Sequence, residues 1–187
     1  MRICLVVILL LAGAAHAATA DDESPRAVGL AVGLGFAVPD RRVGKDGSGP
    51  GAYAEAEYIF RLAHWFTPRL YAGLLLAPPE SNCGAGVVPC DVSARIVFAG
   101  AKFRLMAPIP YVGPFIELGI GASAGRISTR SGQRVDVTGE GLMYHVPVAL
   151  GLALGGRHQF EIALQYLVHP EQQQICGAAA LGVTLNL

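Results

Sequence analysis

The chain has 187 residues, of which 52% are hydrophobic and only 15% are charged, against about 25% charged residues in an ordinary soluble domain. Fourteen Lys and Arg balance fourteen Asp and Glu, which excludes a disordered polyelectrolyte and gives no support for a nucleic-acid partner. The 24 Gly and 12 Pro are too many for a helical bundle, and the length suits one domain.

The first 20 residues have the form of a secretory signal peptide. Arg2 precedes an apolar stretch over 3–12, and two small-x-small cleavage sites follow, which end at Ala17 and Ala20. The alternative is a membrane anchor, but an anchor needs about 20 apolar residues. We therefore expect residues 1–20 to be removed and residues 21–187 to form one exported domain.

A two-residue alternation runs through the exported part. Between 28 and 38 every second residue is large and apolar, and the residues between them are all Gly or Ala. This period is typical of a strand with two different faces. The pattern predicts strands over 28–38, 52–62, 69–77, 96–105, 112–125, 142–154, 159–168 and 177–187.

Each predicted strand has one continuous apolar face and one face that is small or polar. A soluble barrel of the lipocalin type is the alternative, but it would carry polar residues on its outer face. An apolar outer face is buried only against lipid, and lipid permits a sheet only when the sheet closes on itself. We therefore expect an all-β fold, an eight-stranded antiparallel up-and-down transmembrane β-barrel.

The connections between the predicted strands alternate in length. Long ones at 39–51, 78–94, 127–141 and 169–176 alternate with short ones at 63–68, 106–111 and 155–158. Outer-membrane barrels have short periplasmic turns and longer extracellular loops, so both termini are expected in the periplasm. Trp65 and Tyr111 fall at short turns, where interfacial rings are expected.

With this leader, these alternating strands and a final strand that runs to the last residue, the chain resembles the small outer-membrane barrels of Gram-negative bacteria. These are the OmpX-like and OmpA-transmembrane-domain barrels, often called the porin family. The chain departs from their usual aromatic last residue, because it ends in Leu187. The resemblance implies an outer-membrane location, with membrane lipid and lipopolysaccharide as partners. It also implies periplasmic chaperones and the barrel-assembly machinery as partners during biogenesis.

The face expected to line the interior carries charges of both signs. Four carboxylates and four cations lie on it: Glu55, Glu57, Glu117, Glu161, Arg61, Arg69, Lys102 and Arg104. An eight-stranded barrel is just wide enough for side chains to fill it, so we expect a salt-bridge network that plugs the interior. Lys102 and Arg104 are expected near Glu117, across the short turn at 106–111. A narrow gated channel for small solutes is the alternative.

The sequence therefore predicts a structural or surface-interaction protein and not an enzyme. Lipid A palmitoyltransferases and deacylases share this architecture, so a lipid A-modifying enzyme is a more distant alternative. The deacylases place a His and a Ser two residues apart on a late strand. Here His169 is followed by Pro170 and Glu171 and by no Ser, whereas acyl transfer needs a nucleophile within reach of its base. No metal-binding or nucleotide-binding motif occurs in the sequence, so no metal or cofactor is expected.

Five arginines at the expected outer rim are candidate contacts for the phosphates of lipopolysaccharide. They are Arg41, Arg42, Arg126, Arg130 and Arg134. A solvated loop surface is the alternative for this set.

Three cysteines belong to the exported part, and an odd number cannot pair fully within one chain. Cys83 and Cys90 flank the Gly- and Pro-containing segment 84–89, and the periplasm is oxidising. We expect a disulfide between these two and a free thiol at Cys176; three free thiols are the alternative.

Overall fold

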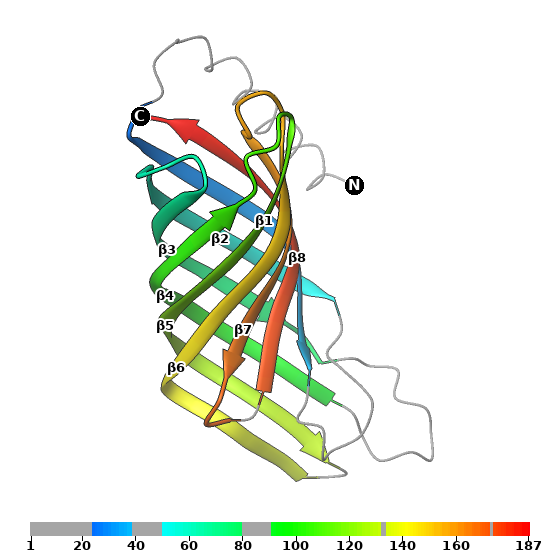
Figure 1. Cartoon of the computed structure of the whole chain (residues 1–187). Coiled ribbons are helices and arrows are strands. Elements are labelled where there is room, and N and C mark those ends of the chain that lie inside the picture. Colours follow the sequence, from blue (N-terminus) through cyan, green and yellow to red (C-terminus); the bar gives the residue numbers. More distant parts are fainter. Residues whose placement is uncertain (1–23, 39–49, 80–90, 132–133, 173) are drawn as a thin grey trace.

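A computed structural model describes residues 24–38, 50–79, 91–131, 134–172 and 174–187. Within these residues, each strand pairs antiparallel with the next. The last strand pairs with the first, so the sheet closes into a barrel (Figure 1). The strands are β1 (Arg26–Val38), β2 (Gly51–Phe60), β3 (Phe66–Ala77), β4 (Asp91–Met106), β5 (Val112–Ser131), β6 (Arg134–Leu154), β7 (Phe160–His169) and β8 (Gln174–Asn186). The predicted fold class, an eight-stranded antiparallel β-barrel, is confirmed.

The described residues include no helix that is long and apolar enough to cross a membrane. The predicted signal peptide over 1–20 lies outside the described residues.

The barrel has two distinct ends. At the short-turn end, the connections 61–65, 107–111 and 155–159 join β2 to β3, β4 to β5 and β6 to β7. The described chain also begins and finishes there, because the backbone N–H of Leu187 donates to the carbonyl of Arg26 at 3.2 Å. The opposite end, where the long connections lie, is called the long-connection end below.

Three strands extend at the long-connection end by five residues or more beyond their predicted ranges. β4 begins at Asp91, and β5 and β6 continue to Ser131 and from Arg134. The predicted long loop over 127–141 is therefore wrong, because most of it forms a β-hairpin that projects beyond its neighbours (Figure 1). The polar residues of this hairpin interrupt the apolar alternation, but backbone pairing does not require apolar side chains.

The outer wall of the barrel is apolar. Leu34, Val97, Ile120, Leu150 and Ile162 are between 50% and 67% exposed, and each belongs to the predicted apolar face of its strand. The alternate residues point inward, and most of those whose side chains the structure describes are buried. The interior has a charged layer towards the short-turn end and an apolar layer towards the long-connection end.

Candidate functional site

Lys102 lies at the centre of the charged layer. Its Nζ lies 2.7 Å from Glu55 Oε1, 2.6 Å from Glu57 Oε1 and 2.8 Å from Glu117 Oε2. The four side chains are between 1% and 7% exposed. One ammonium therefore compensates three buried carboxylates, each of which would be costly without a partner.

Arg104 joins this centre to β7. Its Nε donates to Glu117 Oε1 at 2.7 Å, and its Nη1 and Nη2 donate to the two carboxylate oxygens of Glu161, both at 2.6 Å. This bidentate pairing is the strong form of an arginine–carboxylate contact. The guanidinium also lies 3.5 Å from the centroid of the Phe115 ring, which adds a cation–π contact.

Arg69 completes the network. Its Nη1 lies 2.5 Å from Glu57 Oε2, 3.6 Å from Glu117 Oε1 and 3.7 Å from Glu161 Oε1. The structure thus brings together seven of the eight charges named from the sequence, four carboxylates and three cations. The eighth, Arg61, lies at the short-turn end of the interior, where its Nη1 donates to the carbonyl of Ser24 at 3.4 Å.

Strand register brings these charges to one level. Arg69 is the cross-strand partner of Lys102, and Arg104 is the partner of Glu117. On the adjacent strand β1, Gly29 is the cross-strand partner of Glu57, and a Cβ at this position would stand 2.9 Å from Glu57 Oε2. The absence of a side chain at Gly29 therefore leaves room for the Glu57 carboxylate.

A second polar group lies beyond Lys102, towards the long-connection end. Ser123 Oγ lies 2.8 Å from His145 Nδ1 and 3.1 Å from His169 Nε2, and Tyr71 Oη lies 2.7 Å from His145 Nε2. The sequence interpretation, which found no Ser within reach of a late-strand His, is corrected here because Ser123 is supplied by β5. Alternation alone places Ser123 and His145 inside, whereas His169 lies one residue beyond the predicted strand 159–168. The contact of the three depends on the register of two strand pairs, β5 with β6 and β6 with β7.

This Ser–His group is enclosed. Ser123, His145 and His169 are all 0% exposed, so a lipid substrate has no access to the Ser hydroxyl. The hydrogen bonds satisfy polar atoms that burial would otherwise leave unpaired. The arrangement is that of a structural cluster.

Apolar side chains fill the interior at the long-connection end. Tyr53 stacks on Phe98 with ring centroids 5.8 Å apart. The surrounding buried cluster includes Leu75, Val92, Ile96, Ile127, Met143, Leu167 and Cys176. Cys176 is a free thiol and is completely buried.

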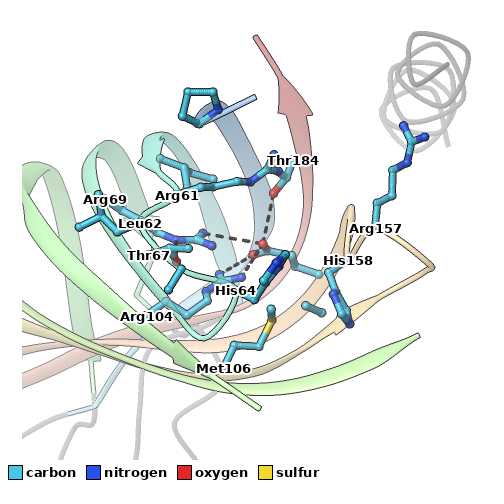
Figure 2. A pocket seen from close by; sticks show the side chains of 15 residues that line it. Arg61, Leu62, His64, Thr67, Arg69, Arg104, Met106, Arg157, His158 and Thr184 are labelled. Atoms are coloured by element: carbon cyan, nitrogen blue, oxygen red, sulfur yellow. Dashed lines mark hydrogen bonds and ion pairs between the residues drawn. The ribbon is translucent and has the colours of Figure 1, made fainter. Parts of the chain in front are cut away.

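A cavity of about 340 Å³ opens at the short-turn end (Figure 2). Its deep wall includes Arg69, Arg104 and Glu161, and Thr184 Oγ1 donates to Glu161 Oε1 at 3.3 Å. Arg61, His64, Arg157 and His158 line it nearer to solvent. This cavity is called the mouth below.

Three of the five arginines predicted to contact lipopolysaccharide belong to the described residues. Arg126 is exposed on the outer face of β5, opposite Arg95 of β4, which the sequence interpretation did not single out. Arg130 and Arg134 belong to the projecting hairpin of β5 and β6. Arg41, Arg42, Cys83 and Cys90 lie outside the described residues, so the disulfide stays a prediction.

No family model matches the chain, and no curated protein sequence matches it significantly. Two solved structures resemble it. Ail, the attachment invasion locus protein of Yersinia pestis, is 15% identical with a TM-score of 0.51, over 88% of this chain and 99% of that one. Neisserial surface protein A is 12% identical with a TM-score of 0.57, over 88% of this chain and 98% of that one. Both are small eight-stranded outer-membrane barrels of the OmpX-like group. The chain has the fold of these barrels.

Proposed function

We propose that the chain is an integral outer-membrane β-barrel with a structural or surface-interaction role, whose interior is closed by the network around Lys102. One observation carries the proposal: a closed sheet exposes apolar side chains around its outer wall up to the level of Arg95 and Arg126, while a network of charges is paired inside. Lipid is the solvent that favours this inverted arrangement.

The closed interior is supported by two layers in series. The ion network of Lys102, Arg104 and Arg69 fills the barrel towards the short-turn end, and the apolar cluster around Phe98 fills it towards the other end. Opening a path would require separating buried ion pairs, which costs several kcal/mol when one partner is left uncompensated. A structural role therefore fits the interior better than solute transport.

The surface role is supported by the shape of the barrel and by what it resembles. Its long-connection end carries the projecting β5–β6 hairpin. Outer-membrane barrels direct their longer loops outwards. One similar protein is described by its name as an attachment and invasion protein and the other as a surface protein.

Lipopolysaccharide is the partner that the outer wall favours. Arg95 and Arg126 are exposed and lie directly opposite each other. They lie one outward position nearer to the long-connection end than the apolar pair Val97 and Ala124. Glu140 of β6 faces Arg126 from the other side, so the three residues together carry one net positive charge, which a lipid phosphate would offset. From the sequence, Arg41, Arg42, Arg130 and Arg134 are further candidate contacts for lipopolysaccharide phosphates. Delivery to the membrane would use periplasmic chaperones and the barrel-assembly machinery.

Epitope tags on whole cells test location and orientation together. A tag inserted after Ser48, in a long connection, is expected to bind antibody on intact cells. The matched control is a tag after Gly156, in a short turn, which is expected to react only after permeabilisation. Reversed labelling would overturn the orientation, and recovery of the protein in the soluble fraction would overturn the membrane location.

A further inference from the structure

The buried ion network carries unequal numbers of the two charges. Its four carboxylates and three cations are those of Glu55, Glu57, Glu117, Glu161, Arg69, Lys102 and Arg104. With every group ionised, the seven charges sum to one negative charge. An uncompensated charge in the interior is costly, so the network favours an additional positive charge beside it.

A small cavity lies against this network, between β1, β7 and β8. Its volume is about 10 Å³, which is room for about one particle of the size of a water molecule. Among the described residues that line it are two acids, Glu57 and Glu161, and one amide, Gln165, whereas none is basic. The polar part of the cavity wall is therefore negative and supplies oxygen atoms.

Gln165 is buried without a hydrogen-bond partner. Its side chain is on the inward face of β7, as is that of Glu161, and the residue is 7% exposed. The amide makes no hydrogen bond with another described residue, and it faces the cavity. Because burying an amide without a partner is costly, its oxygen is a ligand in search of an occupant of the cavity.

We propose that this cavity binds one monovalent cation of the size of sodium, between the carboxylates of Glu57 and Glu161 and the amide oxygen of Gln165. Hard cations take oxygen ligands of these kinds. One positive charge makes the network neutral, whereas a divalent ion would leave an excess of positive charge. The described residues also contain no group of three or more His, Cys, Asp and Glu that could hold a metal ion, and calcium and magnesium need about six ligands or more.

The mouth gives the ion a way in. Glu161 lines both the mouth and the small cavity, and its side chain is 13% exposed. An ion from the short-turn end therefore reaches the site past a single carboxylate. Beyond the site the apolar cluster fills the barrel, so the bound cation is part of the closed interior and does not pass through it.

Urea unfolding of the refolded protein tests this in sodium chloride and in choline chloride at the same ionic strength. Choline is too large for the cavity. A ligand that binds only the folded state lowers the unfolding equilibrium constant by the factor 1 + [L]/Kd, or about elevenfold when sodium is at ten times its Kd. The Kd itself comes from the broadening of the sodium resonance in nuclear magnetic resonance of the same sample.

Two variants remove the site in different ways. Gln165→Leu removes the amide oxygen. Gly182→Ala places a methyl group at the cavity and keeps every ligand, because its nearest contacts would be the Leu30 carbonyl oxygen at 3.3 Å and Glu161 Cβ at 3.5 Å. In both variants the ratio of the unfolding constants in the two salts is expected to fall to about one. Gly156→Ala, in a short turn, is the matched control and should keep the full ratio.

Two results would overturn the proposal. Equal unfolding constants of the unmodified protein in the two salts would mean that a proton on one carboxyl, and not a cation, offsets the negative charge. A sodium effect that persists undiminished in Gly182→Ala would mean that the ion binds elsewhere. This second result decides the matter even if Gln165→Leu fails to refold, because Gly182→Ala removes no polar group.

Discussion

Arg104 and Glu117 face each other across β4 and β5, and Arg104 Nε donates to Glu117 Oε1 at 2.7 Å. Glu117 is also 2.8 Å from Lys102, and it is 1% exposed. One carboxylate thus compensates two buried cations. The stability of the barrel should depend on it more than on any exposed acid.

Glu117→Ala is expected to destabilise the barrel by about 3–5 kcal/mol, because it removes a buried carboxylate that pairs with both Lys102 and Arg104. The single tryptophan, Trp65, is 57% exposed at the short-turn end, and its fluorescence reports urea unfolding in phospholipid vesicles. Glu171→Ala is the matched control at an exposed position and should change the free energy of unfolding by less than about 0.5 kcal/mol. Equal effects of the two substitutions would contradict the buried network.

Gly121 is expected to be irreplaceable. A Cβ there would stand 2.7 Å from His145 Nε2, and closer still to Tyr71 Oη. Gly121→Ala should therefore cost about 1–3 kcal/mol through overpacking, and adding Tyr71→Phe should recover part of the loss by removing the hydroxyl. Gly156→Ala is the control, since its nearest contact would be at 3.7 Å. The same urea titration measures all four proteins, and a neutral Gly121→Ala would refute the packing.

Leu118→Arg tests whether the outer wall faces lipid. Leu118 is 44% exposed on β5, and an arginine near the bilayer midplane costs about 2–4 kcal/mol, falling to about 0–1 near the interfaces. Leu62→Arg, at the short-turn end, is the interfacial control. A soluble barrel would tolerate both substitutions equally, so equal free energies of unfolding would exclude the transmembrane assignment.

Ser123→Ala tests the role of the buried Ser–His group. The substitution removes the shared partner of His145 and His169 and is expected to cost about 1–3 kcal/mol, because buried polar atoms lose their hydrogen bonds. Ser128→Ala is the comparison, since Ser128 pairs with Ser93 at 2.9 Å in a less buried position. If Ser123→Ala were as mild as Ser128→Ala, the group would not contribute to stability.

The sequence predicts the barrel well because each strand has two chemically distinct faces. Alternation alone places Glu117, Lys102 and Arg104 inside and Leu118 outside. It fails for the β5–β6 hairpin, where polar residues continue the strands and the register shifts between Ile127 and Ser128.

The sequence also does not predict which inward-facing side chains of different strands come into contact. The meeting of Ser123 with His145 and His169 depends on the stagger of β5, β6 and β7, which no local pattern contains. The mouth likewise combines the turn 61–65, the turn 155–159 and the start of the described chain, and these come together only when the barrel closes.

Conductance across a planar lipid bilayer tests the closed interior most directly. The exported chain is refolded, and its insertion is verified by recovery with floated vesicles. The structure predicts no steady conductance steps, because ion pairs and the apolar cluster fill the barrel in series. Uniform, ohmic steps from the unmodified protein would contradict the closed interior and would establish the barrel as a channel.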